Sequence, residues 1–160
     1  LAGFNTAVTA PGLIPAPPTV EENIYAARFL NLAYHYSAQP SLRKAAEHAM
    51  RFLAAPEIID SRFEEVGILM ADEELAQAPL HITIVGSKND PKAQALFLET
   101  LKISNSYARI EWWDRAEGAL PNPDVQYPQL KTAAGFVCTE KRCSLPAFTP
   151  EALKTLIGSH

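Results

Sequence analysis

The sequence predicts a mixed α/β fold: a helical hairpin plus a third helix packed on a small mixed sheet, with a βαβ unit and a C-terminal β-hairpin and helix. Three observations support this prediction. Apolar residues recur at helical spacing between residues 20 and 78. From residue 79 a strand pattern, a helix pattern and a second strand pattern follow one another, which implies a parallel pair of strands. Near the end, two short apolar runs flank the polar stretch "TEKR", as in a hairpin.

The composition excludes several classes of protein. The chain has 160 residues, 48% hydrophobic and 20% charged, which is typical of a globular protein of one domain or two small units. A net charge of −4 offers no basic surface for nucleic acid, and no apolar run approaches the roughly 18 residues of a membrane span. We therefore expect neither nucleic acid nor membrane as a partner. The start at Leu1 without a secretory leader suggests a piece of a longer protein.

The first 78 residues are expected to form a strap followed by helices. Prolines at 11, 15, 17 and 18 predict an extended linker or strap over residues 1–18. Thr19 and Glu22 fit a capping box, in which hydroxyl and carboxylate each accept from a backbone N–H, at the start of a helix over 20–37. Its apolar face is broad enough to be buried on two sides; the residues are Ile24, Ala27, Phe29, Leu30, Ala33, Tyr34 and Tyr36.

A second helix from Pro40 follows the 3.6-residue period to Leu53 and completes an αα-hairpin. A third helical stretch is expected between Ile58 and Gln77, broken near Gly67. The domain organisation is therefore a strap at 1–18, a helical segment at 19–78 and a small α/β subdomain at 79–160.

In the subdomain, "LHITIVG" alternates apolar residues with His81 and Thr83 and predicts a strand. Asp90 and Pro91 suit the N-cap and first turn of a helix that runs to about residue 102. The stretch "YARIEWW" predicts the next strand, "AAGFVC" and "CSLPAF" the closing hairpin, and Thr149 the cap of a last helix.

The two cysteines are the main candidate for chemistry. A four-residue loop would place Cys138 opposite Cys143, with Cα atoms about 4.5 Å apart if the pair is not hydrogen-bonded, close enough for a disulfide. Three interpretations of the two cysteines stay open: a structural pair, a redox-active pair or part of a metal site. Lys141 and Arg142 would favour a thiolate, but the spacing is not the C-x-x-C of thioredoxin-type centres. Zinc would need two more ligands, and the histidines show no metal spacing.

Two further candidates concern ligand binding. Ser87 lies in "IVGSKNDP", a strand-to-helix turn whose N–H groups suit an anion, although the stretch lacks the complete glycine-rich nucleotide patterns and is more simply an ordinary turn. Trp112 and Trp113 suit a sugar or aromatic ligand, but neighbours in a strand point to opposite faces. One tryptophan is therefore expected in the core and the other against a neighbouring element. No catalytic residue, metal or cofactor is predicted.

The segment "AAGFVCTEKRCSLPAFTPEAL" resembles the C-terminal signature of the thioredoxin-domain-containing protein family, which has spermatogenesis-associated members in animals and many uncharacterised bacterial ones. "ENIYAARFLNLAYHY" and "HITIVGSKNDPKAQAL" are similar to its late helical hairpin and its strand and helix. The resemblance covers residues 19–157 and only the final portion of the family's length. The matching signature positions are Phe136, Val137, Cys138, Cys143, Pro146 and Pro150.

The resemblance implies a parent with an N-terminal thioredoxin-like domain and an (α/α)6 barrel similar to N-acylglucosamine 2-epimerases and six-hairpin glycosidases. Neither is complete in this sequence, and the family's thioredoxin-type cysteine centre has no counterpart. We therefore expect a non-catalytic C-terminal structural and interaction module whose partner is the barrel, the thioredoxin-like domain or a second copy. The rival functions are thiol–disulfide exchange at Cys138 and Cys143, and carbohydrate binding at Trp112 or Trp113. Bacterial cytoplasm and periplasm both suit the cysteine pair.

Overall fold

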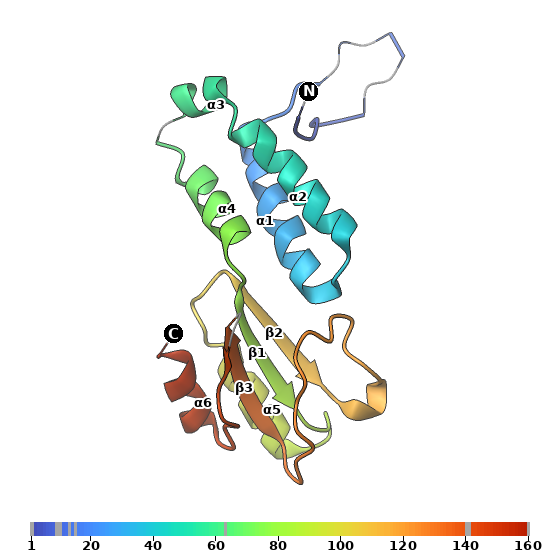
Figure 1. Ribbon diagram of the computed structural model, residues 1–160, viewed down its shortest axis with the longest axis vertical. Helices are drawn as coiled ribbons and strands as arrows, with labels where there is room; N and C mark the ends of the chain where they lie inside the picture. Colours follow the sequence, from blue (N-terminus) through green and yellow to red (C-terminus); the bar gives the residue numbers. More distant parts are fainter. Residues whose placement is uncertain are drawn as a thin grey trace. The chain divides into compact units, whose positions relative to one another are not determined.

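The structure is a computed structural model, which describes residues 2–8, 11–12, 14, 16–62, 64–139 and 142–159. The predicted mixed α/β class is confirmed. The chain divides into two compact units, Leu1–Gln77 (unit 1) and Ala78–His160 (unit 2), coloured blue to green and green to red in Figure 1. Within the described part of the chain, no helix has the length and apolar character needed to cross a membrane.

Unit 1 is helical and contains α1 (Val20–Ser37), α2 (Pro40–Leu53), α3 (Pro56–Ser61) and α4 (Val66–Ala76). The first two helices form the predicted hairpin, and Pro40 occupies the first turn of α2 as expected. Small residues let α1, α2 and α4 approach closely, so the unit has a core of its own. The fully buried members of this core are Ala27, Ala49, Leu53 and Ala71.

The third helical stretch differs from the prediction. It is two helices, α3 and α4, separated at residues 62–65, whereas Gly67 lies inside the first turn of α4. The carboxylate of Glu65 accepts a hydrogen bond from the Gly67 N–H and so caps α4. A Cβ atom at Gly67 would lie 2.9 Å from Cδ1 of Ile24. This glycine therefore permits α4 to pack on α1 and does not break a helix.

The start of α1 also differs from the expected capping box. Thr19 is the N-cap residue, but its hydroxyl donates to Glu22 Oε2 at 2.9 Å and caps no backbone N–H. Asn23 is fully buried and donates to the backbone oxygens of Thr19 and Phe4, at 2.8 and 3.0 Å, while its Oδ1 accepts from the Phe4 N–H at 2.7 Å. Part of the opening segment is thus held against α1 by one amide side chain.

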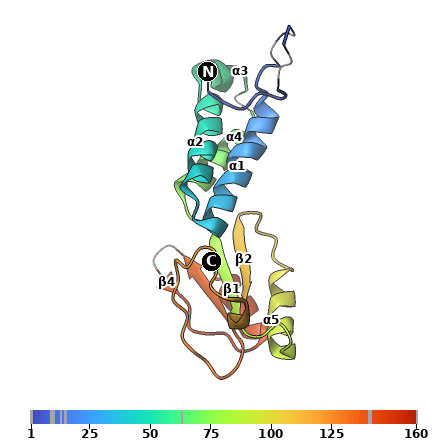
Figure 2. The same ribbon diagram turned by 90° about the vertical axis from the view of Figure 1, so that its right-hand side faces the viewer.

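Unit 2 is built on a four-stranded sheet in the order β2-β1-β3-β4 (Figures 1 and 2). Its strands are β1 (Leu80–Val85), β2 (Ala108–Trp113), β3 (Ala134–Thr139) and β4 (Arg142–Cys143). The pair β1 and β2 is parallel, as predicted, and β3 runs antiparallel to β1. The helices are α5 (Pro91–Thr100), capped by Asp90, α6 (Pro150–Ile157), capped by Thr149, and the short 3-10 turn η1 (Arg115–Glu117).

The two faces of this sheet have different environments. The helices α5 and α6 cover one face, where Leu96 and Leu153 pack with Ile82, Ile84 and Val137. The loop between η1 and β3 covers part of the other face. Its residues Val125, Tyr127 and Leu130 pack against Val85, Ala134, Phe136 and Cys138.

The closing hairpin is shorter than predicted, because the second strand keeps only Arg142 and Cys143. The Ser144 N–H still donates to the Val137 oxygen at 2.8 Å, but Pro146 has no N–H to contribute to the ladder. Pairing resumes only at Ala147, which exchanges two 2.8 Å hydrogen bonds with Gly135.

Candidate functional site

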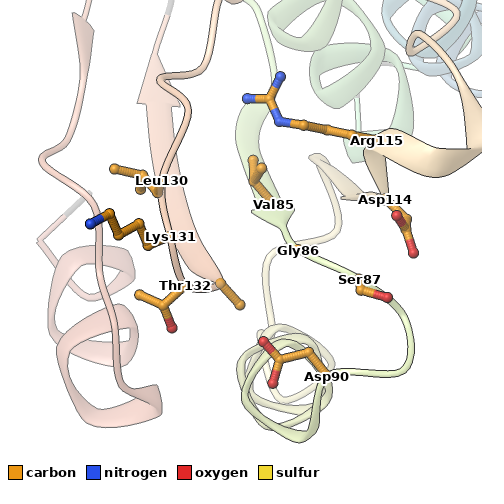
Figure 3. Close-up of a pocket in the computed structure, with 10 residues that line it drawn as sticks. Val85, Gly86, Ser87, Asp90, Asp114, Arg115, Leu130, Lys131 and Thr132 are labelled. Carbon is orange, nitrogen blue, oxygen red and sulfur yellow. The ribbon is translucent and has the colours of Figure 1, made fainter.

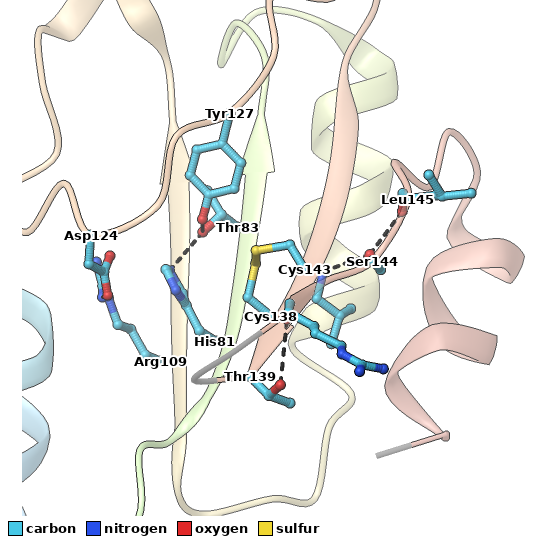
Figure 4. The surroundings of a disulfide bond; sticks show 12 residues. His81, Thr83, Arg109, Asp124, Tyr127, Cys138, Thr139, Cys143, Ser144 and Leu145 are labelled. Carbon is cyan, nitrogen blue, oxygen red and sulfur yellow. Dashed lines mark hydrogen bonds and ion pairs between the residues drawn. A yellow bond between two sulfur atoms is a disulfide. The ribbon is translucent and has the colours of Figure 1, made fainter.

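Cys138 and Cys143 form a disulfide, with sulfur atoms 2.06 Å apart (Figure 4). The hairpin register pairs them directly across β3 and β4, as the four-residue loop predicts. Cys138 is 2% exposed, whereas Cys143 lies exposed on the short edge strand. The bond therefore has a buried end and a solvent-facing end. Lys141, expected to influence a thiolate, lies outside the described residues.

Four polar side chains lie beside the buried end and are called here the polar row: His81 and Thr83 on β1, Arg109 and Glu111 on β2. The parallel register pairs His81 with Arg109 and Thr83 with Glu111, so all four project from one face of the sheet. The antiparallel register places Cys138 opposite His81 on that same face. All four members of the polar row are buried.

A chain of hydrogen bonds passes through His81. Its Nε2 lies 2.9 Å from Glu111 Oε2 and 2.9 Å from Thr83 Oγ1. The Tyr127 hydroxyl donates to Thr83 Oγ1 at 2.7 Å, from the loop that covers this face. Burial raises the pKa of Tyr127 to about 12, so this phenol stays protonated and remains a donor at neutral pH.

Arg109 completes the network although its side chain is almost entirely buried. Its Nη1 contacts Asp124 Oδ2 at 2.7 Å, and its Nη2 contacts Glu111 Oε2 and the Asn122 oxygen, both at 2.8 Å. The buried guanidinium is therefore compensated by two carboxylates, one from β2 and one from the loop. These contacts hold the loop over the polar row.

A cavity of about 300 Å³ opens where β1 and β2 end, the edge at which open α/β sheets usually bind ligands (Figure 3). Ser87 lines it, and three of the charged residues in the lining, Asp90, Asp114 and Arg115, already contact other protein groups. Asp90 caps α5, and backbone hydrogen bonds from Lys88 and Ala116 lower the pKa of Asp114. The complete lining is Val85, Gly86, Ser87, Asp90, Asp114, Arg115, Leu130, Lys131, Thr132 and Ala133.

The two tryptophans lie on opposite faces of the sheet, as predicted. Trp112 packs against Phe97, with ring centroids 4.9 Å apart, and its Nε1 donates to the Gly86 oxygen. On the polar-row face, the Arg115 guanidinium carbon lies 4.2 Å from the Trp113 ring centroid. The rings therefore form no shared platform for a sugar.

Sequence reasoning missed the polar row as a unit. Its members occupy alternate positions of two strands, and this period-two pattern was the available signal. Their meeting with Asp124 and Tyr127 depends on a loop path that no local pattern encodes. Among the residues that the structure describes, no three histidine, cysteine or carboxylate side chains are grouped so that they could hold a metal ion.

Comparison of the chain with protein-family models, with curated proteins and with solved structures found no match.

Proposed function

We propose that the chain is a non-catalytic structural and interaction module, the C-terminal portion of a thioredoxin-domain protein with an epimerase-like helical barrel. The supporting observation is an aromatic surface on α1. Tyr25 and Phe29, one helical turn apart, are each 70% exposed, and Leu32 continues the same line at a half-buried position. These three residues are called the outer stripe.

The outer stripe lies on the side of α1 away from its packed face. Ala27 and Asn31 on the packed face are fully buried. Large aromatic side chains on the free side of a helix mark an interaction surface, because solvent-facing positions normally carry polar residues. The spacing of four and then three residues suits packing against another helix.

The occupant that best fits this surface is a helix of the parent's barrel. An α/α barrel repeats antiparallel helical hairpins side by side, and each hairpin buries apolar residues against its neighbours. The α1 and α2 hairpin has the connection and the two-sided apolar character that such a repeat requires. Carbohydrate binding has less support, since both tryptophan rings are packed against protein groups.

The test compares two double variants of the chain. Tyr25→Ser with Phe29→Ser removes the outer stripe, and Leu98→Ser with Leu101→Ser is the matched control, since these leucines of unit 2 are similarly exposed. Binding to the separately produced barrel segment of the parent is measured by titration calorimetry. We expect binding by the unmodified chain and the control, and its loss in the outer-stripe variant.

Circular dichroism checks that each variant keeps its helical content. Equal binding by both double variants would overturn the assignment of the outer stripe. Sedimentation velocity tests whether a second copy of the chain covers the surface instead. A dimer that dissociates only in the outer-stripe variant would assign the surface to a second copy of the chain and not to the barrel.

A further inference from the structure

We propose that the Cys138–Cys143 disulfide is a thiol–disulfide exchange site, in which a dithiol attacks Cys143 and Cys138 leaves beside His81. This proposal concerns unit 2 and does not depend on the outer stripe of unit 1. It rests on the asymmetric burial of the bond, on the polar row beside it and on the short loop that the bond closes.

The asymmetric burial decides which sulfur is attacked. Exchange requires in-line approach of a thiolate to one sulfur of the disulfide, so access governs the site of attack. Cys143 is exposed on β4, an edge strand of two residues. Cys138 lies on β3, between β1 and β4 in the sheet, and is buried in a cluster with Val85 of β1 and Phe136 of β3. Attack is therefore directed to Cys143, and Cys138 becomes the leaving group.

The polar row supplies the proton that the leaving sulfur needs. A thiolate in apolar surroundings is unfavourable, so departure of Cys138 is helped by a neighbouring acid. His81 lies directly opposite Cys138, at a position where Cβ atoms of paired strands are about 4.5–5.5 Å apart. The described hydrogen bonds of its ring are made by Nε2, toward Glu111 and Thr83, so the proposed proton exchange with Cys138 is assigned to Nδ1.

Two charged side chains belong to the network around His81. Glu111 Oε2 lies 2.9 Å from the imidazole Nε2, and Arg109 pairs with both Glu111 and Asp124. Tyr127 faces the same network through Thr83 and stays neutral. Among the described residues, the titratable and charged side chains that hydrogen bonds and ion pairs link to His81 are Glu111, Arg109, Asp124 and Tyr127.

The short loop means that the bond can open without unfolding the unit. Only four residues separate the cysteines, and the stabilisation gained by closing a loop falls as the loop shortens. The strand β3 is held independently by its ladder with β1, which pairs five residues from His81 to Val85. Reduction would therefore release β4 and leave the rest of the sheet intact.

Reduction of the Cys138–Cys143 disulfide takes two successive thiol attacks. A thiolate of the dithiol forms a bond to Cys143 Sγ, the bond between the two cysteine sulfurs breaks, and Cys138 Sγ takes the electron pair and a proton from His81. The second thiol of the reductant then attacks the mixed disulfide, and Cys143 leaves and is protonated from solvent. The dithiol is oxidised to a disulfide, and the protein gains two thiols.

The first experiment identifies the attacked sulfur. The oxidised protein is treated with glutathione, a monothiol that traps the mixed disulfide, then quenched in acid, alkylated and digested with trypsin, which cleaves between the cysteines at Lys141 and Arg142. We expect the glutathione adduct on Cys143 to exceed that on Cys138 about tenfold or more, because the attacking thiolate reaches the exposed Cys143 more easily than the buried Cys138. Comparable adducts on both cysteines would overturn the proposal.

The second experiment tests His81 through the pH profile of reduction by dithiothreitol. We expect His81→Gln to slow reduction and to change the dependence of the reduction rate on pH, because glutamine cannot act as the proton donor. His48→Gln, a histidine of unit 1 bonded to the Gly3 oxygen, should leave the profile unchanged. Tryptophan fluorescence checks that both variants are folded.

A third measurement separates an exchange site from an inert staple. Reduction of the native chain is compared with reduction of the same chain unfolded in urea, at equal pH and thiol concentration. We expect the native protein to react faster, since His81 is positioned only in the fold. Slower reduction in the native state, or an unchanged profile in the His81 variant, would overturn the proposal.

Discussion

Replacement of Arg109 by methionine should destabilise unit 2 by about 3–5 kcal/mol, the usual effect of removing one partner from a buried ion pair. Methionine replaces only the inner aliphatic part of the side chain and leaves Glu111 buried without its guanidinium partner. The lost contact to Asp124 adds only about 0–1 kcal/mol to the destabilisation, because the Asp124 carboxylate is half-exposed. His81 remains hydrogen-bonded to Glu111 and partly compensates the buried carboxylate, so we expect a destabilisation near the lower end of this range.

The unpaired, buried carboxylate of Glu111 in Arg109→Met also predicts how a double variant behaves. In Arg109→Met with Glu111→Gln, the uncompensated buried charge is removed, so the added substitution should restore part of the lost stability. The two effects should be strongly non-additive, by about 1–3 kcal/mol, because the side chains are in direct contact. A purely steric role for Arg109 would give no such recovery.

Urea unfolding followed by tryptophan fluorescence is the appropriate assay, because both tryptophans of the chain belong to unit 2. With a slope of about 2 kcal/mol per molar urea, a loss of 3 kcal/mol would lower the midpoint by about 1.5 M. Lys88→Met, which breaks an exposed pair with Glu117, is the control and should change stability by less than about 0.5 kcal/mol. A change below about 1 kcal/mol for Arg109→Met, or further destabilisation by the added Glu111→Gln, would refute the reasoning.

Three other substitutions test separate features of unit 2. A Cβ at Gly135 would lie 2.9 Å from Leu153 Cδ1, so Gly135→Ala should cost about 1–3 kcal/mol in urea unfolding and should be partly relieved by Leu153→Val; full additivity would contradict the clash. Thr149→Ala should cost about 1 kcal/mol, because the hydroxyl accepts from the Ala152 N–H at the start of α6, whereas Thr149→Ser should be nearly neutral. Because folding raises the pKa of Tyr127 from 10.0 to about 12, its neutral form stabilises unit 2 below pH 10, and this contribution is lost as pH rises through 12. Tyrosinate absorbance should show one late-titrating phenol that Tyr127→Phe removes, and its persistence in that variant would contradict the assignment.

The sequence by itself determined the elements whose ends carry local signals. Pro40, Asp90 and Thr149 mark helix starts by their own backbone or side-chain chemistry, and the alternation in "LHITIVG" places β1 within a residue. The placement of Cys138 opposite Cys143 belongs to this class, because a single short loop separates the two cysteines. Such features depend on contacts within a few residues, and a local pattern contains all of them.

Only the tertiary structure decided what long-range contacts control. Gly67 carries no signal that distinguishes a helix break from a close approach, since the deciding neighbour, Ile24, is on another helix. The Thr19 hydroxyl donates to Glu22 and caps no backbone N–H, whereas Asn23 binds the incoming chain at Phe4, which is distant in the sequence. The polar row meets Asp124 and Tyr127 only because the loop before β3 folds back over the sheet. The environment of the disulfide thus depends on strand register and loop path, and these are set by packing between segments that are distant in the sequence.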